Sequence, residues 1–181
     1  MKLVILDRDG VINYDSDAYI KSPAEWRPIP GSLEAIAKLT HAGFTVTVAS
    51  NQAGVARGLF DLDTLAAIHR KMQAAVEQAG GKLAGIFYCP HGPDDGCDCR
   101  KPKPGLLKQI ARRFGANLHG VPAVGDSLRD IEAAESAGAR PLLVRTGKGE
   151  ITLASLGDPP RVEVFKNLAA AADQLISEAQ A

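Results

Sequence analysis

A chain of 181 residues is long enough to form one domain around one sizeable core. It carries 21 Lys and Arg residues against 21 Asp and Glu residues, and this zero balance gives no bulk attraction to nucleic acid or to an anionic membrane. No apolar run is long enough to span a bilayer or to act as a secretory leader, so we expect a cytoplasmic protein with neither kind of partner.

Apolar strands alternate with helical patterns along the whole chain, which is typical of stacked βαβ units. The predicted strands cover about residues 3–6, 44–49, 86–88, 122–125, 141–144 and 162–165. The predicted helices cover about residues 33–42, 62–79, 104 onward, 130–137 and 168–179. We therefore predict an α/β fold over residues 1–181, with a Rossmann-like parallel sheet and helices on both faces.

Residues 11–30 show no clear period and are expected to form a long loop or flap, which in a compact domain is often functional. The alternative is a surface excursion that is held down by the packing of Trp26.

Carboxylates and a serine follow the predicted strands directly. Asp7 and Asp9 follow the first strand, where Gly10 allows a sharp turn, Ser50 follows the second strand and Asp126 follows the fourth. The carboxyl ends of parallel strands meet at one edge of a sheet, so the three aspartates should converge there and suit Mg²⁺. Taken alone, the Asp7–Gly10 stretch could also be an ordinary polar strand exit.

Such a site could transfer a phosphoryl group. Asp7 could attack phosphorus to give an aspartyl phosphate, and Asp9 could hand a proton to the leaving alcohol. The Ser50 hydroxyl, backbone N–H groups and a lysine from Arg100–Pro104 could hold the phosphoryl oxygens, although that basic stretch could instead be a solvated turn. Asp130 is either a supporting acid or simply a residue that starts a helix.

The three cysteines of the chain form a second cluster with a histidine. Cys89 and His91 are separated by a five-residue loop from Cys97 and Cys99, which suits tetrahedral Zn²⁺. Four protein ligands leave no open position, so the zinc should be structural and should pin a loop over about residues 89–105. The alternative is three unrelated loop or core cysteines.

The aspartate motifs resemble those of the haloacid-dehalogenase-like (HAD) phosphohydrolases. The matching residues are Asp7-Arg8-Asp9-Gly10-Val11, Ser50, a following lysine, and the Gly125–Asp130 stretch. The resemblance implies Asp7 as nucleophile, Asp9 as general acid and base, and Mg²⁺ held by Asp7, the Asp9 carbonyl and Asp126. The intervals between the motifs are too short for a separate cap domain, so loops would select the substrate.

Together with the zinc loop, nearly the whole chain looks like the D-glycero-D-manno-heptose-1,7-bisphosphate 7-phosphatase family. The supporting stretches are Asp7–Asn13, Ser50–Gly58, Tyr88–His91 and Cys97–Pro102. By this resemblance Lys101 steadies the transferred phosphoryl group and Arg100 contacts the retained phosphate, although physics alone does not choose between Lys101 and Lys103. The remaining substrate-binding residues implied are Asp15, Tyr19, Ser50, Asn51, Gln52, Arg57 and Ser127.

The resemblance implies a Mg²⁺-dependent enzyme that removes the C7 phosphate of the heptose bisphosphate, in the synthesis of activated heptose for cell-envelope glycans. We expect a monomer, which a site without a cap domain allows but does not require. The sequence departs from the family at Val11 and Ser50, where Thr is frequent, and at Ser127, where some members carry Lys. Two alternatives stay open at this point. One is a histidinol-phosphate phosphatase, and the other is a non-catalytic, zinc-containing module that binds phosphosugars.

Overall fold

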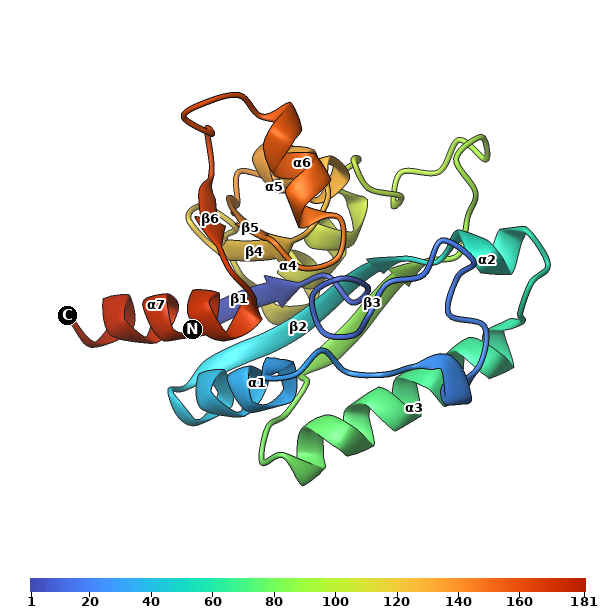
Figure 1. Ribbon diagram of the computed structural model, residues 1–181, viewed down its shortest axis with the longest axis horizontal. Coiled ribbons are helices and arrows are strands. Elements are labelled where there is room, and N and C mark those ends of the chain that lie inside the picture. Colours follow the sequence, from blue (N-terminus) through green and yellow to red (C-terminus); the bar gives the residue numbers. More distant parts are fainter.

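A computed structural model describes all 181 residues and contains one six-stranded parallel sheet, with strand order β3-β2-β1-β4-β5-β6 (Figure 1). The strands are β1 (Lys2–Leu6), β2 (Phe44–Asn51), β3 (Gly85–Cys89), β4 (Pro122–Gly125), β5 (Arg140–Val144) and β6 (Glu163–Phe165). All six predicted strands are confirmed. Strand β2 is longer than predicted, because Ser50 and Asn51 still pair with β3.

Helices cover both faces of the sheet, as predicted (Figure 1). One face carries α1 (Ser32–His41), α3 (Leu62–Gln78) and α7 (Leu168–Gln180), and the other carries α4 (Gly105–Phe114) and α5 (Leu128–Ser136). The sequence did not predict the short elements η1 (Pro23–Glu25), α2 (Ala53–Ala56) and α6 (Gly149–Ser155). None of the helices combines the length and the apolar character that crossing a membrane requires.

Strand β1 is buried on both of its faces. Val4 and Leu6 belong to the larger core under α1, α3 and α7, whereas Leu3 and Ile5 belong to the core under α4 and α5. The strand lies between β2 and β4, where the chain order of the sheet reverses. Ligands of open α/β sheets bind outside the carboxyl ends of the strands at such a reversal. The residues that follow β1 and β4 therefore meet at a natural binding position.

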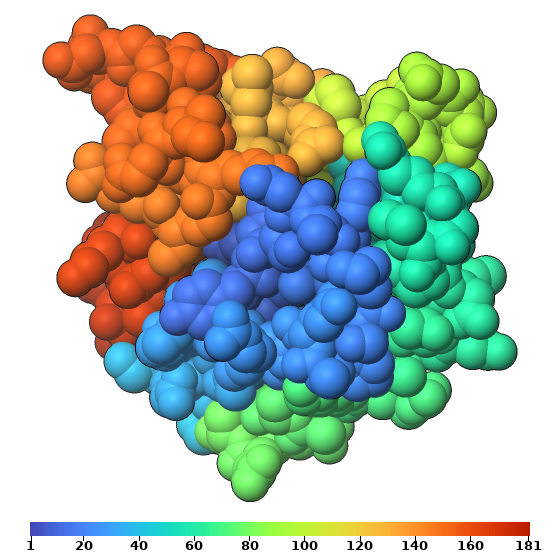
Figure 2. All heavy atoms as spheres, turned by 45° about the vertical axis from the view of Figure 1, so that its right-hand side comes forward, coloured from blue at the N-terminus to red at the C-terminus, as the bar shows by residue number.

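The flap, residues 11–30, lies across the middle of the face shown in Figure 2, between the α6 region (orange) and the α2 region (teal). Trp26 is only 1% exposed and packs in the larger core, and the Lys71 Nζ of α3 donates to the carbonyls of Pro23 and Trp26. Trp26 thus anchors the segment, while its residues Asp15 and Tyr19 line the cavity described next.

Candidate active site

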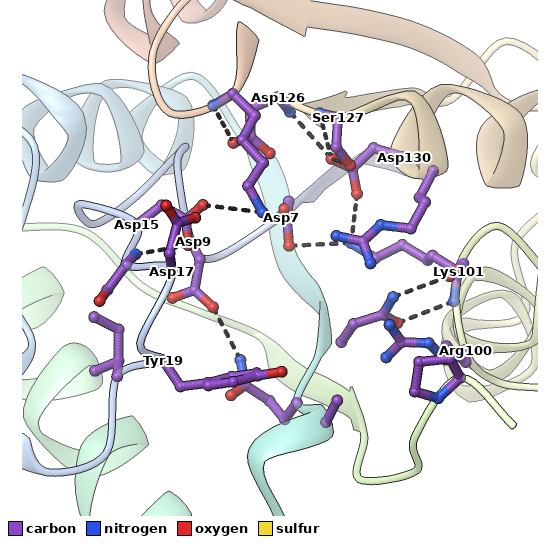
Figure 3. A pocket seen from close by; sticks show the side chains of 18 of the residues that line it. Asp7, Asp9, Asp15, Asp17, Tyr19, Arg100, Lys101, Asp126, Ser127 and Asp130 are labelled. Atoms are coloured by element: carbon purple, nitrogen blue, oxygen red, sulfur yellow. Dashed lines mark hydrogen bonds and ion pairs between the residues drawn. The ribbon is translucent and has the colours of Figure 1, made fainter. Parts of the chain in front are cut away.

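A polar cavity of about 320 Å³ opens at the carboxyl ends of β1, β2 and β4 (Figure 3). Most of the predicted site residues line it, namely Asp7, Asp9, Asp15, Tyr19, Asn51, Gln52, Arg57, Arg100, Lys101, Asp126 and Ser127. Ser50 does not. It is fully buried behind the wall of the cavity, where its hydroxyl accepts a hydrogen bond from Gln52 Nε2 at 2.8 Å.

Three carboxylates converge at one end of this cavity. Oxygens of Asp7, Asp126 and Asp130 all lie within 4.8 Å of one another. Burial and the like charge of Asp130 raise the pKa of Asp7 to about 7, and burial and the charge of Asp7 raise that of Asp126 to about 8. Burial and, to a smaller extent, the repulsion between the carboxylates thus both disfavour their charged forms. The donor set is hard and rich in oxygen, so these residues fit Mg²⁺.

The turn after β1 is shaped around Asp126. Gly10 has a φ of +83°, and a side chain at this position would collide with the Asp126 carboxylate. The carbonyl of the preceding Asp9 accepts no hydrogen bond in the structure. The Asp9 carbonyl is therefore free to act as the third cation ligand that the family resemblance implies.

Lys101 is a buried ammonium group in the wall of the cavity. It is 4% exposed, and its Nζ donates to Asp7 Oδ1 at 3.0 Å, to Asp130 Oδ1 at 2.7 Å and to the Ala49 carbonyl at 2.8 Å. Burial alone would lower its pKa, but Asp130 and Asp7 raise the pKa of Lys101 above its usual value. Lys103 points elsewhere, because its Nζ donates to the Cys97 carbonyl. The geometry thus singles out Lys101 where the sequence left two lysines open.

Asp130 combines the two roles that the sequence left open. Its Oδ2 accepts from the Asp126 amide, the Ser127 amide and the Ser127 hydroxyl, which forms a capping box at the start of α5. Its Oδ1 accepts from Lys101. Burial would raise the pKa of Asp130, but the Lys101 ammonium lowers it below its usual value. A charged Asp130 therefore starts the helix and also fixes the lysine.

The prediction that the side chain of Asp9 converges with those of Asp7 and Asp126 is wrong, because Asp130 takes that place and the Asp9 carboxylate faces a set of donors instead. Its Oδ1 accepts from Arg8 Nε at 3.0 Å and Asn13 Nδ2 at 2.9 Å, and its Oδ2 accepts from Arg8 Nη2 at 3.1 Å and Gln52 Nε2 at 3.2 Å. Asp7 therefore lies beside the Lys101 ammonium, whereas Asp9 lies beside the Arg8 guanidinium. Two carboxylates in such different environments are suited to different chemical roles.

The predicted zinc residues lie together at the end of β3. Cys89 Sγ is 3.6 Å from Cys97 Sγ and 3.4 Å from His91 Nδ1, which is 3.3 Å from Cys99 Sγ. A tetrahedral zinc with Zn–S bonds of about 2.3 Å spaces its sulfur ligands about 3.8 Å apart. The spacing of these atoms therefore fits the group. The His91 carbonyl also accepts from Arg100 Nη1 at 3.5 Å, which connects this cluster to the cavity.

Sequence reasoning missed two cations that line the cavity, Arg129 and Lys148. Arg129 lies within the recognised Gly125–Asp130 stretch, and its charge, after burial, contributes to a lowered pKa of Arg100. Lys148 precedes α6, and its amide donates to Asp126 Oδ2 at 2.8 Å. Its Nζ lies 3.6 Å from the flap carboxylate of Asp15. No sequence motif includes Lys148, and the short helix α6 that follows it has no apolar pattern that would have predicted the turn.

Comparisons with known proteins give a consistent picture. The family model described as HAD-hydrolase-like matches residues 98–171, and the model described as polynucleotide kinase 3 phosphatase matches residues 2–129. The chain is 62% identical to the D-glycero-β-D-manno-heptose-1,7-bisphosphate 7-phosphatase of Bordetella bronchiseptica, over 99% of this chain and 100% of that protein. It is 60% identical to the protein of the same name from Pseudomonas putida, over 97% and 100% of the two chains.

Solved structures agree with this sequence similarity. The crystal structure of D,D-heptose 1,7-bisphosphate phosphatase from B. bronchiseptica, complexed with magnesium and phosphate, matches with a TM-score of 0.95 and 61% identity over 98% of this chain and 99% of that one. The related enzyme from Burkholderia thailandensis matches with a TM-score of 0.77 and 46% identity over 98% and 99%. The parallel sheet and its helices thus have a solved counterpart over nearly the full length of the chain.

Proposed function

Since the chain belongs to the D-glycero-β-D-manno-heptose-1,7-bisphosphate 7-phosphatase family of HAD-like hydrolases, we propose that it removes the C7 phosphate of D-glycero-β-D-manno-heptose 1,7-bisphosphate. It is a phosphoric monoester hydrolase, which excludes the non-catalytic binding module. One observation carries the substrate assignment. A single cavity holds the Asp7–Lys101 pair, and Arg100 and Arg129 line the same cavity, as two phosphates on one small molecule require.

The two metals have separate places in this proposal. Asp7, the Asp9 carbonyl and Asp126 would hold Mg²⁺, which when bound neutralises the clustered carboxylates and brings the phosphate to them. Cys89, His91, Cys97 and Cys99 would hold a structural Zn²⁺ that keeps the 89–105 loop in shape. The convergence of the Asp7 and Asp126 carboxylates, and that of the four Cys and His atoms, supports this assignment.

Asp7 is the proposed nucleophile. Its Oδ1 is engaged by the Arg8 amide at 2.8 Å and by Lys101 at 3.0 Å, whereas its Oδ2 accepts no hydrogen bond. Oδ2 attacks phosphorus, the bond from phosphorus to the sugar C7 oxygen breaks, and Lys101 stabilises charge on the phosphoryl oxygens. Asp9 donates a proton to the departing oxygen. It then takes a proton from the water that hydrolyses the aspartyl phosphate and regenerates Asp7.

The remaining residues orient the substrate. Arg100 and Arg129 bind the retained C1 phosphate, because a guanidinium pairs well with a phosphate. Asp15 and Tyr19 of the flap face the sugar hydroxyls, and the Arg57 guanidinium lies 5.7 Å from the Tyr19 ring. For Ser50 the buried position supports a role in holding Gln52, which donates to Asp9. Asn51 fixes the backbone of Lys101 through two hydrogen bonds, and Ser127 caps α5 beside Asp126.

Steady-state phosphate release with purified protein and Mg²⁺ tests the proposal. The substrates are both anomers of the heptose bisphosphate, heptose 7-phosphate, histidinol phosphate and a 3′-phosphorylated oligonucleotide. We expect the β-bisphosphate to have the highest kcat/KM. Arg100→Met should lower that value by about tenfold or more, because a charged hydrogen bond is lost, while barely changing turnover of the 7-phosphate.

The exposed Arg112 of α4 lies outside the cavity and supplies the matched control, Arg112→Met. Equal turnover of bisphosphate and monophosphate by the wild-type protein would contradict the assignment of substrate. A higher kcat/KM for histidinol phosphate would favour the alternative phosphatase, and a higher value for the oligonucleotide would favour a nucleic-acid substrate.

A further inference from the structure

Arg8 is a buried charge with no role in the mechanism above. It lies in sequence between the proposed nucleophile and the proposed acid, yet its side chain is 0% exposed and does not line the cavity. Its Nε and Nη2 donate to the two oxygens of Asp9. A buried charge is costly unless it is paired and hydrogen-bonded, so this arrangement needs the remaining donors of Arg8 to be satisfied as well.

His69 of α3 provides the next partner. Its Nε2 lies 3.2 Å from Arg8 Nη1. A guanidinium can only donate, so Nε2 must accept and the imidazole must be neutral, with its proton on Nδ1. Burial, with the charge of Arg8 adding to it, lowers the pKa of His69 to about 3, which is consistent with that neutral state. The ring is held against Tyr88, with centroids 5.8 Å apart.

We propose that Arg8 and His69 form a positioning pair, in which His69 holds the Arg8 guanidinium and the guanidinium fixes the direction of the Asp9 carboxylate toward the leaving oxygen. The planar guanidinium donates to both carboxylate oxygens, so it fixes the plane of the Asp9 carboxylate as well as its position. The other two donors to Asp9 are single amide groups, Asn13 and Gln52, and neither can set that plane alone. This inference rests on the proposed function.

The physical consequence concerns proton transfer. A general acid must lie within about 2.6–3.2 Å of the atom that it protonates, and a misplacement of about 1 Å can cost roughly a hundredfold in rate. A sugar alkoxide needs that proton to leave, whereas p-nitrophenolate is a weak base that leaves without one. Loss of positioning should therefore reduce kcat/KM for the sugar phosphate much more than for p-nitrophenyl phosphate.

The test compares these two substrates in His69→Leu, which keeps the volume and removes the acceptor, and in His69→Gln, whose side-chain oxygen can accept from Arg8. We expect His69→Leu to lower kcat/KM for the heptose bisphosphate by roughly tenfold, which is a part of the roughly 100- to 10,000-fold that a general acid contributes, and that for p-nitrophenyl phosphate by less than about twofold. His69→Gln should recover most of the loss.

Arg8→Lys is the second variant, in case His69→Leu does not fold. A lysine keeps the positive charge beside Asp9 but cannot bond both carboxylate oxygens in one plane, so it should show the same selective loss. An equal loss on both substrates, or no loss on either, would overturn the positioning role. Absence of wild-type activity on the sugar phosphates would instead refute the proposed function itself, so the two failures are distinguishable.

Discussion

Replacement of Lys101 by methionine removes the buried ammonium that donates to Asp7, to Asp130 and to the backbone at the end of β2. The Lys101 Nζ bonds Asp7, Asp130 and the Ala49 carbonyl, all within 3.0 Å. Methionine is of similar length but can donate to none of them. The variant therefore leaves two buried carboxylates facing each other and one carbonyl without a partner, while the apolar packing of the side chain is largely kept.

The size of the effect follows from these contacts. Removal of one partner of a buried ion pair costs about 3–5 kcal/mol, because the other charge is left uncompensated. Asp130 still accepts hydrogen bonds from Asp126 and Ser127 in the variant, which limits the destabilisation caused by its unpaired charge. We expect Lys101→Met to lower the free energy of unfolding by about 3–5 kcal/mol in zinc-loaded, magnesium-free protein. Lys101 also lowers the pKa of Asp7, so the loss should be larger at pH 8 than at pH 6.

Lys103→Met is the matched control. The Lys103 Nζ makes one hydrogen bond, to the Cys97 carbonyl at the surface, so its removal should change the free energy of unfolding by no more than about 0.5 kcal/mol. Urea unfolding measures the stability of both variants. Phosphate release should show kcat falling by about a hundredfold or more for Lys101→Met and remaining near wild type for Lys103→Met. Equal losses in the two variants, or a selective loss in Lys103→Met, would refute this reasoning.

Two further predictions concern the metals. The raised pKa values of Asp7 and Asp126, about 7 and about 8 against an ordinary 3.8, mean that the folded state binds protons that the unfolded state has released. The melting temperature of magnesium-free wild type should therefore rise, relative to that of an Asp7→Asn, Asp126→Asn variant carrying the same bound zinc, as pH falls from 8 to 6.5. The comparison cancels the protons that the zinc ligands take up on unfolding. A difference in melting temperature that is flat or falls over this interval, measured by calorimetry, would contradict the carboxylate cluster. Cys99→Ser should lower bound zinc measured by atomic absorption, and should raise KM for the bisphosphate more than it lowers kcat, because the loop that supports Arg100 loosens. Full zinc occupancy with unchanged kinetics would argue against the proposed ligand set.

The sequence predicted the strands and their meeting point because the signal there is local and strong. Val4, Ile5 and Leu6 form a run buried on both faces, and an acidic residue follows at once. A parallel sheet then brings Asp7 and Asp126 to one edge whatever the details of the loops. The grouping of Cys89, His91, Cys97 and Cys99 was predictable for a similar reason, since these residues are close together along the chain.

The remainder depends on contacts between residues far apart in the chain. Nothing near Arg8 in sequence indicates that its side chain turns inward to meet His69, which lies 61 positions away. Lys148 approaches Asp126 only because the loop before α6 folds over Gly10, and that helix carries no periodic pattern. The buried Ser50 hydroxyl accepts a hydrogen bond from the side-chain amide of Gln52, and the residue types alone do not predict that contact.

The central claim is that Asp7 accepts the phosphoryl group, and chemical trapping tests it most directly. Borohydride reduces an aspartyl phosphate to homoserine, and trypsin then separates the two candidate aspartates, because cleavage after Arg8 leaves Asp7 in the peptide 3–8 and Asp9 in the peptide 9–21. During turnover of the bisphosphate with Mg²⁺, mass spectrometry should find homoserine at position 7 and none at position 9. Homoserine at position 9, or at neither position while phosphate is released, would contradict the account.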